Sequence, residues 1–356
     1  MSKKALVAVV GAGPIGIELA IALKQAKITY FQFDKGQTAQ MIFNFPPQTY
    51  FFSSTERIGI AGIPIQTIDQ GKCSREQYLA YLRSVVMQYQ LVINTYEEVI
   101  NIERLQSDDF QLTTKSLEGE KQYQVRYLVL ATGGTSYPRL LGVPGEDLPH
   151  VSTKLEDPHK YFQKNVLIIG AKNSAAESAL RCYHAGAKAS LAIRKAQIES
   201  QDVKYWVLPE LLQRIQRKEI GCFYQAPVES IMRDRVVLKR TEEPKTIEVQ
   251  ADFVIKTIGF QSDMRLFHQL GVPLSPEQES PIFDEQTMET AVPGVFVLGT
   301  VVGGTQKKYK VFIENTHIHV AKIMNSLCRK LGLENQWAQA AADHAFRLRP
   351  GAQLEE

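Results

Sequence analysis

The sequence of 356 residues predicts an α/β fold in which one βαβ domain is inserted into another. Three observations predict this fold. An apolar strand, a glycine-rich turn and a helix follow one another within residues 5–33, and the same order recurs within residues 165–193. A third apolar strand, at 294–298, leads into another glycine and a long helix, which indicates a return to the first domain. The length exceeds what one hydrophobic core usually organises and agrees with two domains.

Composition and charge exclude several classes of partner. The formal net charge is only +3, and neither end carries a long basic run, so neither nucleic acid nor a membrane surface is expected as a partner. The apolar run Ala5–Val10 is short and leads straight into a glycine turn, which favours a buried strand over a signal peptide. No apolar stretch approaches the about 20 residues that span a bilayer. We therefore expect small-molecule partners.

Cysteine and histidine spacing predicts neither a disulfide framework nor a metal site. His317 and His319 are two positions apart and would face different sides of a helix. The cysteines lie far apart, form no CxxC pair and fit a reducing cytoplasm. They are Cys73, Cys182, Cys222 and Cys328.

The first βαβ unit is the strongest signal in the sequence. The unit consists of a strand from Ala5, a helix over 17–25 and a second strand over 29–33. The turn between the first strand and the helix contains Gly11, Gly13 and Gly16, which satisfy GxGxxG. These glycines are typical of a tight turn, close approach to a pyrophosphate and close helix–strand packing. Asp34 follows 18 positions after Gly16, near the offset of roughly 20 residues at which an acid accepts ribose hydroxyls. The unit predicts a Rossmann-like dinucleotide site.

The second βαβ unit is a degraded copy of the first. It consists of a strand over 166–169, a turn from Gly170, a helix through Tyr183 and a strand over 189–193. In this copy Lys172 replaces the middle glycine of the turn. Arg194 and Lys195 stand where an NAD-binding unit would carry an acid, so they favour the 2′-phosphate of NADPH. The alternative interpretation, two solvated surface charges, stays open at this point.

Three further strands end in glycine and complete two nested Rossmann-like domains. They are predicted at 127–130, before Ala131-Thr132-Gly133; at 253–257, before Ile258-Gly259; and at 294–298, before Gly299-Thr300. The last is followed by a helix over about 313–330, whose amino end would stabilise negative charge on a bound ligand. The predicted boundaries are 1–137 for the first part of one domain, 138–262 for the inserted domain, 263–330 for the second part and 331–356 for a carboxyl-terminal tail.

Several longer segments resemble the two-dinucleotide-binding flavoproteins of the thioredoxin reductase type, over about residues 5–330. Within that group the sequence is most similar to the bacillithiol-disulfide reductase-like branch. The segments that carry the resemblance are Phe51-Phe52-Ser53-Ser54 through Gly62-Ile63-Pro64, Gly142-Val143-Pro144-Gly145-Glu146-Asp147-Leu148-Pro149, Lys204-Tyr205-Trp206-Val207-Leu208-Pro209 and Phe312-Ile313-Glu314-Asn315.

The resemblance implies an FAD domain interrupted by an NADPH domain, in a cytoplasmic homodimeric oxidoreductase that reduces a small disulfide or a related acceptor. The residues expected at the FAD are Gly11, Gly13, Pro14, Ile15, Gly16, Asp34, Lys35, Val99, Ala131, Thr132, Gly133, Gly299, Thr300, Glu314 and Asn315. Those expected at the NADPH are Gly170, Lys172, Asn173, Ser174, Ala175, Arg194 and Lys195, with Ile258 and Gly259 as further cofactor-binding positions. Glu177 matches an acid near the nicotinamide, or is a helix-surface carboxylate.

Two residues depart from the pattern that the resemblance implies. Thr300 stands where most of the wider family carries an Asp, and a hydroxyl can still donate there. The resembled branch also lacks that Asp, so this departure favours the branch. Ile15 stands where a cysteine has been proposed to act in that branch. Cys73 is the best substitute, because it precedes Ser74 and Gln77, a capping box at the start of a helix running to about Tyr89, and a helix amino end lowers a thiol pKa. A free loop cysteine is the alternative.

The missing CxxC leaves the acceptor half-reaction open. Hydride transfer from NADPH to flavin needs positioning and no protein nucleophile. One alternative is a flavin monooxygenase, although residues 134–165 lack the Trp of the motif that such enzymes usually carry. Another is a non-catalytic nucleotide-bound redox sensor. A reductase fed by ferredoxin is a third, although Arg194 and Lys195 favour NADPH as the electron donor.

Overall fold

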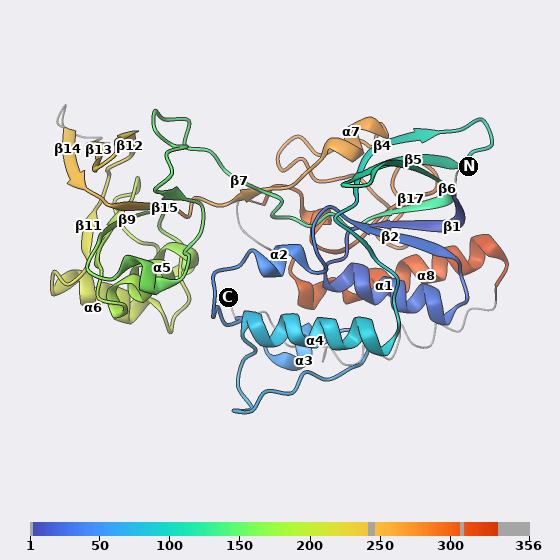
Figure 1. Cartoon of the computed structure of the whole chain (residues 1–356), viewed down its shortest axis with the longest axis horizontal. Coiled ribbons are helices and arrows are strands. Elements are labelled where there is room, and N and C mark those ends of the chain that lie inside the picture. Colours follow the sequence, from blue (N-terminus) through green and yellow to red (C-terminus); the bar gives the residue numbers. More distant parts are fainter. Residues whose placement is uncertain (1–2, 241–245, 307–309, 334–356) are drawn as a thin grey trace. The chain divides into compact units, whose positions relative to one another are not determined.

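The structure is a computed structural model that describes residues 3–240, 246–306 and 310–333. The chain divides into two compact units: unit 1 contains the residues up to 137 and those from 260 on, and unit 2 contains residues 138–259. Figure 1 shows unit 1 as the blue-to-teal start and the orange-red end of the chain, and unit 2 as the green-to-yellow middle. The assignment of one cofactor to each unit stays a prediction.

Unit 1 is built on a seven-stranded sheet. Its order is β3-β2-β1-β6-β5-β4, with β17 parallel to the second half of β6. The strands β3, β2, β1, β6 and β17 are parallel to one another, whereas β4 and β5 are antiparallel additions. Their bounds are β1 Lys3–Val10, β2 Tyr30–Asp34, β3 Asn94–Thr95, β4 Glu98–Arg104, β5 Phe110–Ser116, β6 Gly119–Leu130 and β17 Val295–Val297.

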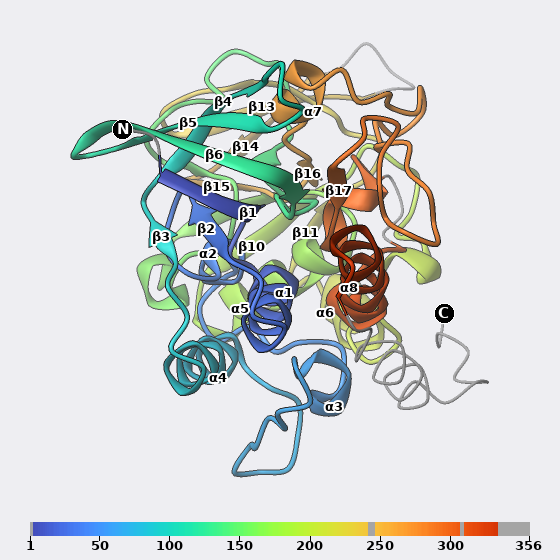
Figure 2. The ribbon, with the colours of Figure 1, turned by 90° about the vertical axis from the view of Figure 1, so that its right-hand side faces the viewer.

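Two long helices of unit 1, α1 and α8, lie side by side next to the parallel strands (Figures 1 and 2). The helix α4 begins with the predicted capping box: the Ser74 hydroxyl accepts from the Gln77 N–H, and the Gln77 side chain accepts from the Ser74 N–H. The bounds are α1 Pro14–Gln25, α2 Gln40–Phe43, α3 Thr55–Ile58, α4 Arg75–Gln88, α7 Arg265–Gln269 and α8 His317–Leu331, with 3-10 turns over Gly299–Gly303 and Ile313–Asn315.

The helix α1 is apolar on nearly all sides because two cores meet on it. Leu19 and Leu23 belong to the core between the sheet and α8. Ile17 and Ile21 belong to a second core, which also contains Tyr78 of α4. A helix that is apolar all round is a buried helix. This burial fixes the position of the glycine turn from which α1 starts.

Unit 2 contains a five-stranded parallel sheet and a three-stranded antiparallel sheet. The parallel order is β11-β10-β9-β15-β8, and the antiparallel order is β12-β13-β14. The strand bounds are β8 Val151–Ser152, β9 Asn165–Ile169, β10 Lys188–Ala192, β11 Gly221–Phe223, β12 Val228–Ile231, β13 Arg235–Lys239, β14 Thr246–Gln250 and β15 Phe253–Lys256; β7 Tyr137–Pro138 pairs with β16 Phe260–Gln261 where the chain passes between the units. The helices are α5 Asn173–His184 and α6 Leu208–Gln216, with 3-10 turns over Pro158–Tyr161 and Ser200–Asp202.

Alternate residues of β9 supply two separate cores. Val166 and Ile168 belong to the core that contains residues of α5 and α6, whereas Leu167 and Ile169 belong to the core that includes residues of β12 to β14. A parallel strand covered on both faces reads as a continuous apolar run, which is how this segment appears in the sequence. The predicted α/β class is confirmed. Within the described ranges, no helix is long and apolar enough to cross a membrane.

Candidate functional site

The first glycine turn joins β1 to α1 and leaves room for a ligand. Gly11 has φ +120°, and a Cβ there would lie 2.2 Å from the Ala131 carbonyl oxygen; a Cβ at Gly16 would lie 2.4 Å from the Gly11 oxygen. A Cβ at Gly13 would meet nothing within 4 Å. Gly11 and Gly16 therefore serve the packing of the turn, and Gly13 faces open space.

The amino end of α1 points its backbone donors into that space. Gly13 is the N-cap residue, Pro14 follows it, and no side chain caps the helix in the described structure. Uncapped N–H groups at a helix amino end bind phosphate, both by hydrogen bonds and through the helix dipole. The turn thus has the donors and the space that a dinucleotide pyrophosphate requires.

Asp34 is fixed beside this turn at the end of β2. Its Oδ2 accepts from the Ala12 N–H at 2.8 Å, and its Oδ1 accepts from the Gly36 N–H at 2.9 Å. Burial raises the pKa of Asp34, and the two N–H donors and Lys35 oppose that rise. Each carboxylate oxygen has a second lone pair, so a carboxylate here can also accept from ribose hydroxyls.

The other predicted residues near Asp34 have more local partners. The Lys35 Nζ atom lies 3.8 Å from Asp263 Oδ2 and 4.9 Å from the centre of the Tyr137 ring. Val99 is 5% exposed and packs in the core of the sheet. Their roles at the adenosine end of a cofactor stay predictions.

The carboxyl ends of β6 and β17 meet over the first turn. Gly134 donates its N–H to Thr300 Oγ1 at 3.0 Å, and a Cβ at Gly299, which has φ +77°, would lie 3.6 Å from the Cβ of Ile15. The Thr132 hydroxyl is buried without a hydrogen-bond partner in the described structure. A buried hydroxyl normally has a partner, so this one fits the polar edge of a bound cofactor. The residues present here fit FAD.

Sequence reasoning missed an ion pair beneath this turn. His317 Nδ1 lies 2.7 Å from Oε2 of Glu18, and His317 Nε2 lies 3.0 Å from the carbonyl oxygen of Arg57. Burial lowers the pKa of His317, but the bonds to Glu18 and to Arg57 more than offset this, and the net shift is upward. Glu18 also accepts from the Ala61 N–H at 3.0 Å. The signal in the sequence was Glu18, which lies within the apolar sequence of α1. A buried glutamate normally has a partner, so its position indicates a buried pair.

Residues at the start of α8 divide between backbone support and contact with neighbouring segments. Asn315 accepts from the Phe312 N–H at 2.8 Å and donates to the Lys310 carbonyl at 2.7 Å, so both ends of its amide hold the local turn. Glu314 accepts from the Ser53 hydroxyl at 2.6 Å. His319 Nδ1 accepts from the Gly299 N–H at 3.3 Å. The predicted difference in direction between His317 and His319 is confirmed.

The second glycine turn has the same backbone form without the middle glycine. Gly170 has φ +144°, and a Cβ there would lie 2.7 Å from Thr257 Oγ1. Lys172 is the N-cap residue of α5 in an extended conformation, and no side chain caps this helix in the described structure. Asn173 Oδ1 accepts from the Lys204 N–H at 2.8 Å, which ties the segment before α6 to the start of α5.

The remaining predicted positions in unit 2 surround that turn. Ser174 is exposed, and its carbonyl accepts from the Ser178 hydroxyl at 2.6 Å, whereas Ala175 is buried. The Gly259 carbonyl accepts from the Arg139 N–H at 3.0 Å, and Ile258 packs at the edge of the core beside the three-stranded sheet. These contacts place the second turn at the carboxyl edge of the parallel sheet, where open α/β sheets bind nucleotides.

The two predicted phosphate-binding cations differ in their surroundings. Arg194 is exposed. Lys195 Nζ lies 2.9 Å from Oδ2 of Asp202, and Lys172 Nζ lies 4.0 Å from Oδ1 of the same residue. Asp202 was missed by sequence reasoning because nothing in its local pattern indicates which cation it meets. The structure brings one acid and two lysines together beside the second turn.

Glu177 lies on the second turn of α5 and is half-buried. Burial raises its pKa to about 7, and Arg181 opposes the rise. A carboxyl group with such a pKa changes its charge near neutral pH. The side chain therefore behaves differently from an ordinary helix-surface carboxylate.

The thiols of this chain are protonated at neutral pH. Cys73 is fully buried in the core formed by α1, α3 and α4, and burial raises its pKa to about 11. The expected lowering of this pKa by the helix amino end is wrong, because the apolar surroundings outweigh the helix. Burial also raises the pKa of Cys182 to about 12 and of Cys222 to about 11, and it raises that of Cys328. None of these groups is a ready nucleophile.

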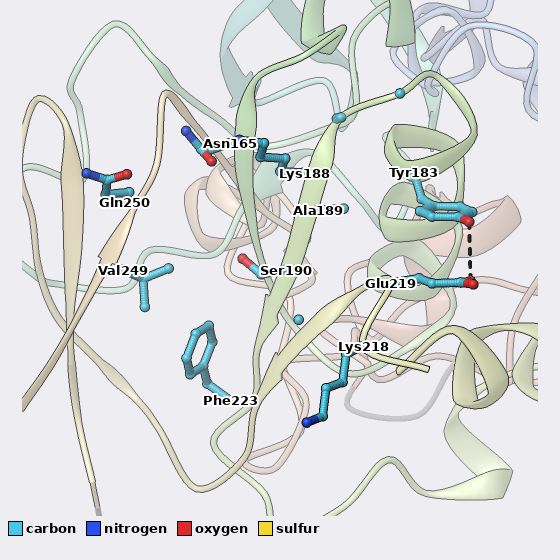
Figure 3. Close-up of a pocket in the computed structure, with 13 residues that line it drawn as sticks. Asn165, Tyr183, Lys188, Ala189, Ser190, Lys218, Glu219, Phe223, Val249 and Gln250 are labelled. Carbon is cyan, nitrogen blue, oxygen red and sulfur yellow. Dashed lines mark hydrogen bonds between the residues drawn. The ribbon is translucent and has the colours of Figure 1, made fainter. Parts of the chain in front are cut away.

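A separate pocket of about 490 Å³ lies in unit 2 at the opposite edge of its parallel sheet (Figure 3). Asn165, Lys188 and Gly221, the first residues of β9, β10 and β11, line it. Figure 3 shows the Tyr183 hydroxyl bonded to Glu219, at 3.2 Å. The glycine turn leaves the other end of β9, so this pocket is distinct from the predicted nucleotide site. Among the described residues, no cluster of three His, Cys, Asp or Glu side chains is arranged to hold a metal ion.

Comparison with known proteins agrees with this geometry. The family model for pyridine nucleotide-disulphide oxidoreductases matches residues 8–299. The bacilliredoxin reductase Bdr of Bacillus subtilis is 34% identical over 322 residues, covering 90% of this chain and 97% of the relative. A ferredoxin–NADP reductase of Ignicoccus hospitalis is 24% identical over 303 residues, covering 82% of this chain and 88% of the relative.

Solved structures show the same likeness. The bacillithiol disulfide reductase Bdr (YpdA) of Bacillus cereus is similar with a TM-score of 0.87 and 29% identity, covering 92% of this chain and 100% of that one. The resemblance inferred from the sequence segments is thereby confirmed. The chain belongs to the pyridine nucleotide-disulphide oxidoreductase family and is an oxidoreductase that uses FAD and a nicotinamide nucleotide.

Proposed function

We propose that the protein takes hydride from NADPH onto FAD and delivers the two electrons to a small disulfide of the bacillithiol-disulfide kind, or to a related acceptor. The observation that carries this proposal is the first glycine turn, where Gly13 faces open space, α1 is uncapped and the Thr132 hydroxyl lacks a partner. The relatives named bacilliredoxin reductase and bacillithiol disulfide reductase support the acceptor class.

The residues of unit 1 would hold the flavin cofactor. FAD, when bound, supplies reversible two-electron chemistry. The first N–H groups of α1 would bind its pyrophosphate, and Asp34 would accept from the ribose hydroxyls. Thr132 and Thr300 line the edge where β6 and β17 end. Ile15, packed against Gly299, contributes shape and no chemistry.

The residues of unit 2 would hold NADPH. The uncapped amino end of α5 would bind the pyrophosphate, and Arg194 and Lys195 would bind the 2′-phosphate. Glu177, with a pKa of about 7, lies one turn further along α5 and would face the nicotinamide end of the nucleotide. A carboxylate there would favour the positive charge that develops on the ring as hydride leaves.

The acceptor step would proceed without a thiolate of this chain. The overall reaction converts NADPH, one proton and one disulfide into NADP⁺ and two thiols. Each of the four cysteine thiols has a raised pKa, so none supplies the attacking sulfur at neutral pH. The electrons would therefore pass directly from the flavin to the acceptor.

A ferredoxin–NADP reductase activity is the second candidate. The thiol chemistry favours it, because electron exchange with an iron–sulfur protein needs no protein nucleophile. Relatives of that name also match most of the chain, at 22–24% identity. A non-catalytic redox sensor is consistent with the same raised thiol pKa values. It would show no catalytic turnover, which distinguishes it from both reductases.

We further propose a cytoplasmic location and a homodimer. The free cysteines support the first. The second rests on the resemblance to the thioredoxin reductase type alone. Light scattering of the purified holoprotein measures its mass, and a monomer at micromolar concentration would contradict the homodimer.

The deciding experiment is anaerobic reduction followed by an acceptor panel. Stopped-flow mixing with NADPH should bleach the flavin absorbance, and bacillithiol disulfide, a bacilliredoxin mixed disulfide or ferredoxin should then restore it. Restoration by the disulfides supports the first proposal, and restoration by ferredoxin alone supports the second. Failure of NADPH to bleach bound FAD would overturn both.

A further inference from the structure

A cluster beside the second glycine turn contains two cations and one acid, Lys172, Lys195 and Asp202. The proposed phosphate site requires the cations but does not require the acid. Lys195 Nζ contacts Oδ2 of Asp202 at 2.9 Å, and Lys172 Nζ lies 4.0 Å from Oδ1. The Asp202 side chain is only 9% exposed, whereas the two lysine side chains are about half exposed. The Asp202 carboxylate is therefore held in one position, whereas the two exposed lysine side chains can change their conformation.

The acid is held in place by the segment that carries it. Asp202 ends the 3-10 turn Ser200–Asp202, and its backbone N–H donates to the Glu199 carbonyl at 2.9 Å. Two residues later, the Lys204 N–H donates to Asn173 Oδ1 at the start of α5. These bonds anchor the carboxylate beside the amino end of α5, where a nucleotide phosphate would lie.

We propose that Asp202 is a built-in competitor of the nucleotide 2′-phosphate for Lys195. This inference rests on the proposed binding of NADPH in unit 2. The carboxylate occupies the Lys195 ammonium in the free protein, and it repels the phosphate when the nucleotide binds. It therefore sets the affinity for NADPH and NADP⁺ below the value that the cations alone would give.

The sign follows from the charges in the cluster. Lys172, Arg194 and Lys195 contribute three positive charges, and Asp202 removes one of them. A phosphate group held by Lys195 would lie within a few ångströms of the carboxylate, where like charges repel. The lysines are exposed, so salt screens the repulsion and weakens the effect. A lower affinity for NADP⁺ favours the release of this product.

The test uses equilibrium titration calorimetry with 2′,5′-ADP, which carries the 2′-phosphate but no nicotinamide. Asp202→Asn keeps the shape of the side chain and removes its charge. We expect the variant of the FAD-bound protein to bind 2′,5′-ADP about threefold to tenfold more tightly at low salt, a gain that shrinks as ionic strength rises. The gain should be smaller for 5′-AMP, which lacks the 2′-phosphate.

Glu199→Gln is the matched control. It removes one negative charge from the same segment, at a side chain whose Oε2 accepts from the Gln197 amide at 3.5 Å. We expect little change in 2′,5′-ADP affinity for this variant. Lys195→Gln should weaken 2′,5′-ADP binding, and in that background Asp202→Asn should gain less than in the wild type.

The outcomes separate this inference from the proposed function. Wild-type protein that fails to bind 2′,5′-ADP would overturn both. Wild-type binding that Asp202→Asn leaves unchanged or weakens would overturn the competitor role alone. An equal gain in Glu199→Gln would also overturn it, since a general charge effect would then suffice.

Discussion

His317 Nδ1 lies 2.7 Å from Oε2 of Glu18 and joins the first residue of α8 to the helix that follows the first glycine turn. The other ring nitrogen lies 3.0 Å from the Arg57 carbonyl, which can only accept. Nε2 therefore donates, and the contact with Glu18 raises the pKa of His317, which favours the imidazolium form. The pair is nearly buried, with 10% and 6% of the two side chains exposed.

Breaking this pair should destabilise unit 1. We expect Glu18→Gln or His317→Gln to lower the free energy of unfolding by about 3 kcal/mol, because each leaves a buried charge without its partner. The double variant should lose less than the sum of the two. Urea unfolding followed by far-ultraviolet circular dichroism measures both, and additive losses would contradict the coupling.

The same pair predicts how stability depends on alkaline pH. Because the folded pKa of His317 is raised above the ordinary value of about 6.5, its contribution is complete below that value and is lost as the pH rises through the folded pKa. The free energy of unfolding should therefore fall as the pH rises above about 6.5, and by more in the wild type than in His317→Gln. Parallel profiles for the two proteins would contradict this assignment.

His319 should act with the opposite sign on the acidic side. Burial, with Lys322 and His317, lowers its pKa to about 4, so the neutral ring accepts the Gly299 N–H. A lowered histidine pKa means that stability falls as the pH drops from about 6.5 toward 4. His319→Asn, whose Oδ1 can accept the same N–H, should flatten this loss and retain FAD. Acid titration with flavin fluorescence checks it; an unchanged acid slope would assign the loss to other groups.

Three glycines of the first turn should respond differently to an added methyl group. Gly13→Ala should fold normally and lose FAD, since its Cβ would meet no protein atom within 4 Å and would enter the space proposed for the pyrophosphate. Gly11→Ala and Gly16→Ala should lose stability as well as flavin, because their Cβ atoms would meet backbone oxygens at 2.2 and 2.4 Å. Flavin content and melting temperature separate the cases. Full flavin in Gly13→Ala would place the cofactor elsewhere.

Cys73 should be dispensable for turnover. With the thiol fully buried and its pKa near 11, Cys73→Ala should change NADPH-driven disulfide reduction by less than about twofold. The native protein should also react slowly with a thiol reagent at neutral pH. A loss of turnover of tenfold or more, with flavin content unchanged, would restore Cys73 as a participant.

Glu177 should give the hydride-transfer rate a pH step near its pKa. The rate of flavin reduction by NADPH should rise as the pH passes about 7, because on the proposed placement the carboxylate form would stabilise the positive charge that develops on the nicotinamide. Glu177→Gln should remove that step and keep the nucleotide affinity. A step that persists in Glu177→Gln would belong to another group.

Local patterns were enough to predict the parts of the fold that depend on short segments. Residue spacing within about 30 positions predicted three of these parts. They are the two βαβ units, the capping box of Ser74 and Gln77, and the helix that follows Gly299. The last helix starts at His317, after a 3-10 turn over Ile313–Asn315, and so begins later than predicted. Helix starts are the least certain part of such predictions, because their caps depend on tertiary contacts.

Contacts between distant segments were beyond the sequence pattern. Glu18 and His317 are 299 positions apart. Cys73 has the predicted helix start beside it, but the packing of α3 and α4 against α1 decides its burial and its pKa. Asp202 is only seven positions from Lys195, but the irregular segment between them offers no spacing rule that would predict their contact. In each case packing, and no local preference, sets the chemistry of the group.

The N–H of Arg139 donates to the carbonyl of Gly259 at 3.0 Å, so the two ends of the inserted unit are hydrogen-bonded to each other. An insertion whose ends touch interrupts its host at a single point. Residues 138–259 should therefore be replaceable by a short turn; on the proposed assignment of FAD to unit 1 and NADPH to unit 2, the remaining protein would bind flavin and no longer recognise nicotinamide nucleotides. The same junction is a natural place at which to graft a different electron-donor module.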